Sequence, residues 1–111
     1  MKQKIKITGV NVHDLLYESF LLRLAFEAGI MRFGAKREIE DGKEVVILTM
    51  DEDERQIEYF GDLLDSERCE KVEILDIEHE AFDGDVPELI LTMTAHNCKM
   101  VGAYCKNKDI R

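Results

Sequence analysis

The stretch Met31–Met50, MRFGAKREIEDGKEVVILTM, decides the fold. Asp41-Gly42 lies near its middle, and this dipeptide is typical of tight hairpin turns because Gly tolerates positive φ. Lys43–Met50, after the turn, is rich in β-branched residues that favour strands. Met31–Ile39, before the turn, is a weaker strand candidate. The stretch therefore predicts a β-hairpin in the middle of the chain.

A helix is predicted on each side of this hairpin. Residues 14–28 form the first helix. Asn11 or His13-Asp14 can cap its N-terminus, and Gly29 stops it as a C-terminal cap. The second begins at Asp51-Glu52-Asp53-Glu54, because carboxylates are favourable at a helix N-terminus. The apolar face of the first helix has 3.6-residue spacing and comprises Tyr17, Phe20, Leu21, Leu24, Ala25 and Ala28. That of the second comprises Ile57, Phe60, Gly61 and Leu64.

Two further strands complete the pattern. Lys2–Thr8 alternates polar and apolar residues, and Val72–Glu78 follows the second helix. The resulting order, β-α-β-β-α-β, is the plan of ferredoxin-like domains. We therefore predict an α+β two-layer sandwich, with an antiparallel sheet and both helices on one face.

The C-terminal part is expected to add one more strand. Asp83-Gly84-Asp85 reads as a turn, and Pro87 precedes a fifth strand at Leu89–Met93. Residues 96–104 fit either a helical face or an extension of that strand, and residues 106–111 read as a frayed end. The chain is expected to form a single domain over residues 1–111, with a core at about 2–80 and an extension at about 86–111.

Charge and cysteine content exclude several classes of protein. The chain has 111 residues and a net charge of −9. Binding to nucleic acids or to an anionic membrane needs clustered Lys and Arg, so neither is expected. No apolar run reaches the roughly 20 residues of a membrane helix. Three cysteines without CxxC spacing fit a reduced, cytoplasmic protein. No cofactor motif is present.

The arrangement resembles the acylphosphatase family over about Ile5–Ile77. The matching features are the end of the first strand, the first helix, the second strand, the hairpin and the acidic second half, as seen in Ile7-Thr8-Gly9, Phe20, Ala25, Gly29-Ile30, Phe33, Asp41-Gly42, Glu44-Val45-Val46 and Arg68–Ile77. In that family a glycine-rich loop after the first strand wraps a phosphate, an Arg pairs with it, and an Asn on the next strand positions water.

The resemblance places this chain's candidate site in the corresponding loop. The loop residues Val10, Asn11, Val12, His13 and Asp14 would form the ligand site, although they include no glycine. Tyr17 or Glu18 falls at the position of the Arg, and a glutamate there would repel phosphate. Lys36 falls nearest the position of the Asn. Lys36 and His13 are thus the candidate catalytic residues, and His13 with Asp14 is an alternative acid–base pair.

Other side chains suggest alternative chemistry. His96, Cys98 and Cys105, with Cys69 or His79, are candidate zinc ligands of a metal-responsive module. Cys98 or Cys105 with His96 as base is a candidate nucleophile. Residues 51–54 are a carboxylate cluster that fits either a divalent cation or a helix start. Buried thiols and a helix start explain these residues without a metal ion or a nucleophile, and the sequence favours that interpretation.

Two surfaces are candidates for contact with another protein. Leu15, Leu22 and Phe26 form a second apolar stripe on the first helix, which fits packing within the chain or a homodimer interface. Residues 51–90 carry 16 acidic and three basic residues, and this segment suits water or a basic protein partner. The sequence therefore predicts a non-catalytic binding or regulatory domain, and the alternatives are an acylphosphatase-like hydrolase of carboxyl-phosphate bonds and the metal-responsive module.

Overall fold

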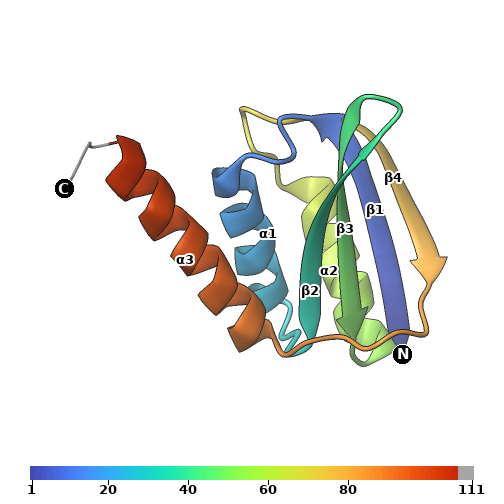
Figure 1. The fold of residues 1–111 in the computed structure, drawn as a ribbon. Coiled ribbons are helices and arrows are strands. Elements are labelled where there is room, and N and C mark those ends of the chain that lie inside the picture. Colours follow the sequence, from blue (N-terminus) through green and yellow to red (C-terminus); the bar gives the residue numbers. More distant parts are fainter. Residues whose placement is uncertain (108–111) are drawn as a thin grey trace.

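The structure is a computed structural model that describes residues 1–107, with side chains through Tyr104 (Figure 1). The chain forms four strands and three helices in the order β1 (Lys2–Val10), α1 (Leu15–Glu27), β2 (Phe33–Glu40), β3 (Lys43–Asp51), α2 (Glu54–Ser66), β4 (Glu73–Ala81) and α3 (Leu89–Asn107). The type and order of the first six elements are those predicted.

The four strands form one antiparallel sheet in the order β2-β3-β1-β4. The predicted hairpin joins β2 to β3, and Glu40 pairs with Lys43 at its end. Asp41 and Gly42 have φ values of 52° and 76°, which are the left-handed values that a tight hairpin turn requires. β1 lies between β3 and β4, so the N-terminal strand is central and β2 and β4 are the edges.

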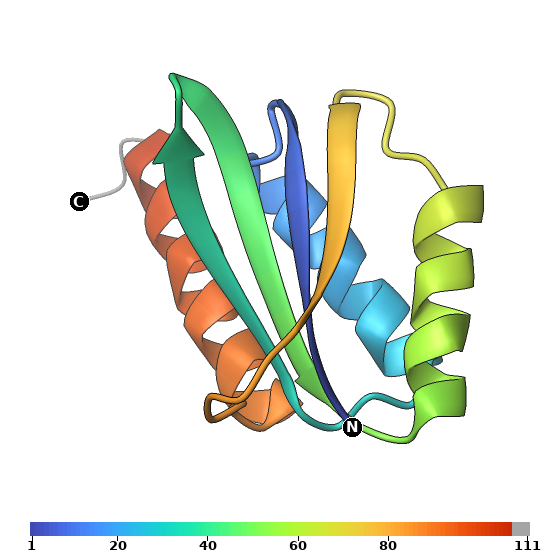
Figure 2. The ribbon, with the colours of Figure 1, turned by 90° about the vertical axis from the view of Figure 1, so that its right-hand side faces the viewer.

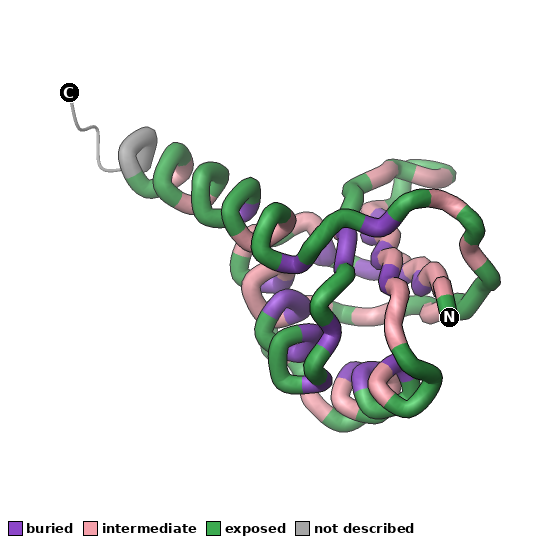
Figure 3. The backbone as a smooth tube through the Cα atoms, turned by 90° about the horizontal axis from the view of Figure 1, so that it is seen from below, coloured by how far each residue is buried: buried purple, intermediate pink, exposed green. Residues whose placement is uncertain are grey.

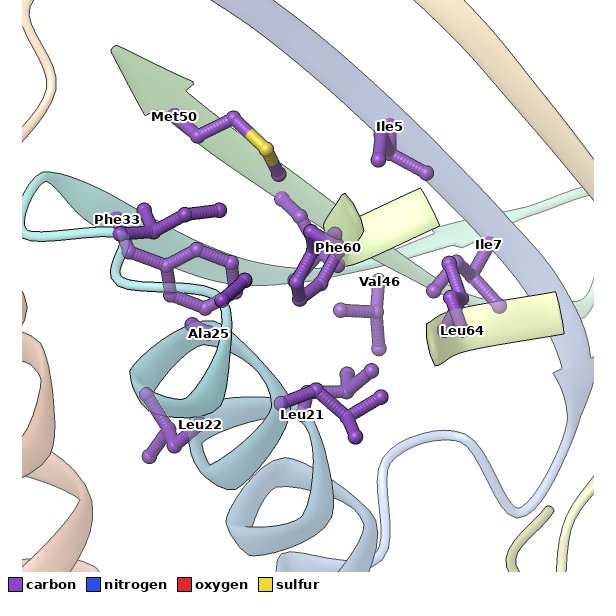
Figure 4. Packing of buried hydrophobic residues seen from close by; sticks show 14 of the residues in the cluster. Ile5, Ile7, Leu21, Leu22, Ala25, Phe33, Val46, Met50, Phe60 and Leu64 are labelled. Carbon is purple, nitrogen blue, oxygen red and sulfur yellow. The ribbon is translucent and has the colours of Figure 1, made fainter. Parts of the chain in front are cut away.

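α1 and α2 pack on the same face of the sheet and enclose the core (Figures 2 and 4). Each begins at a capping aspartate, because Asp14 accepts the N–H of Leu16 and Asp53 accepts the N–H of Arg55. Phe33 of β2 and Phe60 of α2 meet at a centroid distance of 5.6 Å. The buried residues at the centre include Ile5, Ile7, Leu21, Leu24, Ala25, Val46, Leu48, Met50 and Leu64.

The prediction of a fifth strand is wrong, because Leu89–Met93 forms the first turns of α3. A short apolar run fits a strand or a buried helix equally well. Three contacts favour the helix. The Glu88 carbonyl accepts the N–H groups of Leu91 and Thr92, and the Thr92 hydroxyl donates to the carbonyl of Phe33 over 2.6 Å. For residues 96–104 the sequence fitted either a helix or an extended strand, and the structure shows that they continue the same helix.

α3 lies beside α1 and the start of β2, and its C-terminal half projects from the body (Figures 1 and 3). The segment before it is fastened to the β2 edge. Phe33 donates its N–H to the carbonyl of Pro87, and Leu89 donates its N–H to the carbonyl of Met31. None of the helices in the described part of the chain has the length and apolar character needed to cross a membrane.

Candidate functional site

The loop between β1 and α1 is held by bonds to its own neighbours. Asn11 has a φ of 65° and donates its side-chain amide to the carbonyl of Lys71. Val12 is 1% exposed and belongs to the core. Asp14 uses its carboxylate to cap α1. Val10 is half exposed at the end of β1.

His13 is fixed from two sides by β3. Its backbone N–H donates to the carboxylate of Glu44 over 3.0 Å. Its ring Nε2 lies 2.8 Å from the carbonyl oxygen of Val45, and since a carbonyl only accepts, Nε2 carries the proton. The chain's own carboxylate therefore binds a loop amide that a phosphate-binding loop would present to its ligand.

The space beside this loop is too small for a phosphate. The hollow that Val12, His13, Lys36 and Arg37 line holds about 10 Å³, which is no more than one water molecule. The side chain of Lys36 is 75% exposed, and its nearest charged partner is Glu38 at 3.6 Å. The predicted loop residues and Lys36 are thus neighbours, but they enclose no ligand-sized cavity.

Glu18 lines the small hollow beside this loop, and its carboxylate contacts α3 in the seam between α1 and α3. Its Oε1 lies 2.7 Å from Nδ1 of His96, which is only 4% exposed. Because a carboxylate accepts, Nδ1 donates. In the neutral ring Nε2 then accepts the hydroxyl proton of Ser19, whose Oγ is 2.6 Å away. The three side chains form a continuous hydrogen-bonded relay across the two helices, here called the seam relay.

Two cations flank the carboxylate of Glu18, which is 11% exposed. Nζ of Lys99, on α3, lies 3.5 Å from Oε2, and a guanidinium nitrogen of Arg37, on β2, lies 4.0 Å from Oε1. Two elements, α3 and β2, therefore supply three positive or hydrogen-bonding groups to one acidic residue. A nearly buried carboxylate needs such partners, because it loses its hydration.

The seam relay has the connectivity of a Ser-His-acid triad but lacks a second component. Ser19 lies inside α1, between Leu15 and Glu27. Backbone N–H groups in the interior of a helix already bond to carbonyls one turn earlier. No pair of such groups is free near the hydroxyl to stabilise an oxyanion, which is a major contribution to acyl-transfer catalysis. The arrangement fits a contact that fixes α3 on α1.

An apolar hollow lies next to the seam relay. It has a volume of about 360 Å³, and its lining residues are Ser19, Leu22, Arg23, Phe26, Met93, His96 and Asn97. Of the predicted interface stripe, Leu22 is buried in the core and Leu15 is half-buried. Phe26 is 68% exposed at the rim of the hollow. This hollow and the outer side of α3 form one continuous surface through Asn97.

A second hollow of about 360 Å³ lies between α1, the end of α2 and β4. Tyr17, Arg68 and Cys69 line it, together with half-buried side chains of β4. Burial, with a smaller contribution from the nearby Cys69, raises the pKa of Tyr17 to about 12, and Arg68 opposes the change. The phenol is therefore kept neutral beside a free thiol.

The remaining sequence candidates lie apart. His96 is engaged in the seam relay, whereas Cys98 is exposed two residues along α3, and the Cys105 side chain lies outside the described residues. Cys69 is partly buried after α2, and His79 is exposed on β4. Within the described part of the chain, no group of three His, Cys, Asp or Glu side chains is arranged to hold a metal ion.

The carboxylate cluster at residues 51–54 has structural partners. Asp51 lies 3.6 Å from the N-terminal ammonium, and Asp53 caps α2. Glu52 accepts the backbone N–H groups of Met31 and Arg32, which fixes the chain before β2. Three of the four carboxylates are thus used within the fold.

No known family model matches this chain, and a search of curated proteins found no match.

Sequence reasoning missed the seam relay, because Glu18 and His96 are 78 positions apart. One signal was present. Glu18 lies between two apolar stripes of α1, and His96 lies in a segment, residues 89–98, that has no other ionisable side chain except Cys98. A charge surrounded by apolar residues on one helix calls for a polar partner on whatever covers it.

Proposed function

We propose that this chain is a non-catalytic binding domain of acylphosphatase-like type, in which the phosphate loop has become a structural loop and α3 provides the binding surface. The contact between the His13 N–H and the Glu44 carboxylate carries this proposal. It puts a negative charge of the protein where the family would hold the negative charge of its substrate. The Glu44 carboxylate would repel a phosphate bound at the His13 N–H, so phosphate binding there is disfavoured.

The topology supports the family part of the proposal. The order β2-β3-β1-β4, with α1 and α2 on one face, is compatible with the split βαβ plan. The residues that carry the resemblance occupy matching places: Gly9 lies near the end of β1, and Phe33 opens β2. α3 is additional to that plan.

The position of Glu18 supports the loss of catalysis. The resemblance puts Tyr17 or Glu18 where the family has its phosphate-binding Arg. Tyr17 is buried in the core, and Glu18 holds His96 of α3. Neither side chain is a cation, and neither points to a free anion site. The other cation of this region, Arg37, faces Glu18.

The outer side of α3 supports a binding role. Ile90, Leu91 and Val101 are each at least 61% exposed. Between residues 90 and 104 the only charged residue is Lys99, which lies toward Glu18. Exposed apolar surface of this extent, on a helix otherwise fastened to the domain, is typical of a contact with another protein.

Hydrolysis of an acyl phosphate tests the non-catalytic part. Purified chain incubated with acetyl phosphate should release phosphate no faster than buffer does. Inorganic phosphate should cause no chemical-shift change at the His13 amide in an NMR titration. The matched variants are Lys36→Ala and Lys43→Ala, since Lys43 is an exposed cation at the hairpin. Hydrolysis that Lys36→Ala abolishes and Lys43→Ala retains would overturn the proposal in favour of an acylphosphatase-like enzyme.

A further inference from the structure

The outer face of α3 has no charged side chain along its described length. Apart from Lys99, which lies toward Glu18, the exposed residues of α3 through Tyr104 are uncharged: Ile90, Leu91, Thr94, Ala95, Asn97, Cys98, Val101, Gly102 and Tyr104. The outer face of α2 provides a contrast within the same molecule, because it carries Glu54, Arg55, Glu58, Asp62 and Asp65. α2 is therefore a solvated helix, and α3 is not built like one.

Gly102 is unexplained by the single chain. A glycine inside a helix destabilises it by about 1 kcal/mol relative to alanine. Among the described residues, no atom lies within 4 Å of the place where a Cβ would be. Nothing in the described part of the chain therefore requires the missing side chain. A second helix that approaches closely at this point would require it.

The charges at the two ends of α3 are opposite. Residues 83–88, just before it, contain Asp83, Asp85 and Glu88 and carry −3. The C-terminal part of α3 contains two lysines, Lys99 and Lys106, and no acidic residue, so it carries +2. Two copies of α3 in antiparallel orientation bring the acidic segment before one helix beside the basic part of the other. The helix dipoles oppose each other favourably in the same arrangement.

We propose that α3 pairs with α3 of a second copy of this chain, antiparallel, about a twofold axis that passes near Asn97. The inference rests on the proposed function, since it assigns the occupant of the same binding surface. Residue 90 of one copy then faces residue 104 of the other, and residue 101 faces residue 93. Val101 of the second copy thus reaches the hollow that Leu22, Phe26 and Met93 line.

The outer face of α3 alone is too small for a stable dimer interface, so the interface must also include the hollow beside it. A stable interface buries about 600 Å² or more on each copy. α3 has 19 residues, which span about 28 Å at 1.5 Å per residue, and a helix is about 10 Å wide. The projected face is therefore about 300 Å². Phe26 and the 360 Å³ hollow beside α3 extend this face, and they explain why a large aromatic residue is left exposed there.

Sedimentation equilibrium on the full chain tests the pairing. We expect twice the chain mass of 12.8 kDa at tens of micromolar. Val101→Glu places two carboxylates in apolar surroundings per dimer and should weaken association at least 100-fold. Tyr59→Glu is the matched control, because Tyr59 is half exposed on α2, and it should leave the mass unchanged. A wild-type chain that is monomeric at hundreds of micromolar, or a dimer insensitive to Val101→Glu, overturns the proposal.

Two further variants separate packing and orientation. Gly102→Ala should raise the helix content of α3 yet weaken the dimer, whereas Gly61→Ala, on α2, should stabilise the chain without weakening the dimer. In a chain with its three cysteines replaced by serine, Asn97→Cys should oxidise to a symmetric cross-linked dimer and Ile90→Cys should not. Cross-linking of Ile90→Cys as well as Asn97→Cys means parallel helices and overturns the antiparallel pairing. If the chain is a monomer and hydrolyses no acyl phosphate, the dimer inference is refuted and the proposed function is not. If the chain is a dimer and does hydrolyse acyl phosphate, the proposed function is refuted and the dimer is not.

Discussion

His96 on α3 donates to Glu18 on α1 over 2.7 Å, and this bond joins residues 78 positions apart. Glu18 is one of the two residues that the acylphosphatase resemblance aligns with a phosphate-binding arginine. In the function we propose, Glu18 therefore fastens an added helix instead of contributing to a phosphate site. The structural consequence is that α3 has a fixed place, and its outer face is therefore presented in one orientation.

Removing the Glu18–His96 contact should destabilise the fold. We expect Glu18→Ala and His96→Ala each to lower the free energy of unfolding by about 2 kcal/mol, because each leaves a buried polar partner unpaired. In a double-mutant cycle the coupling should be about 1 kcal/mol or more. Urea denaturation of the four proteins measures it. The exposed pair of Arg23 and Glu27 is the control, since Glu27→Ala should change stability by less than about 0.5 kcal/mol. Additive effects of the two seam substitutions would contradict this assignment.

Ser19 should be unreactive toward fluorophosphonate probes, which label activated serine nucleophiles. Its hydroxyl bonds to His96, but the neighbouring backbone N–H groups belong to the interior of α1. An attacking oxygen there would create a negative charge without donors to stabilise it. Mass spectrometry after prolonged exposure should show unlabelled protein. Labelling that Ser19→Ala removes would identify the seam relay as a catalytic triad instead.

Gly61→Ala should stabilise the chain by about 1 kcal/mol. Gly61 lies inside α2, and among the described residues no atom is within 4 Å of the place of an added Cβ. Alanine therefore gains helix propensity without a clash. Thermal unfolding checks the result. Gly9→Ala is the opposite case, because its Cβ would collide with the carbonyl oxygen of Glu73, and it should lower stability. A destabilised Gly61→Ala protein would indicate a contact on α2 that a single chain does not show.

The first six elements could be predicted because their signals are local. Alternation in β1, the Asp41-Gly42 turn, and the aspartate caps each act within a few residues of the structure they specify. α3 could not, since Leu89–Met93 fits a strand or a helix, and the contact that favours the helix includes the Phe33 carbonyl of a distant strand.

The candidate ligand site stays a prediction. Val12 and His13 of the loop line the same small hollow as Lys36. Whether the loop can bind an anion depends on the carboxylate of Glu44 on β3, which accepts the N–H of His13. No pattern in the loop sequence indicates that bond. The seam relay depends on a helix whose presence was itself not predicted. Both misses come from side chains that meet only after the sheet and α3 are assembled.

Stability should fall at high pH because of Tyr17. Tyr17 is 2% exposed, and burial raises its pKa from 10.0 to about 12. The unfolded chain loses this proton near pH 10, while the folded chain keeps it until about pH 12. The contribution of the neutral phenol is therefore complete below pH 10 and is lost as the pH rises to 12. The loss should be about 3 kcal/mol in the free energy of unfolding, at about 1.4 kcal/mol per pKa unit.

Tyr17→Phe isolates this effect, because lysines also titrate in the same range. The free energy of unfolding of both proteins is measured in urea at pH 9, 10, 11 and 12, and the difference between them is plotted against pH. The tyrosine protein should lose stability relative to the phenylalanine protein as pH rises. Tyrosinate absorbance gives a second readout, since the part of the change that Tyr17→Phe removes should appear only as the pH approaches 12. Parallel stability curves, with that part of the change near pH 10, would mean that solvent reaches the Tyr17 hydroxyl through the adjoining hollow.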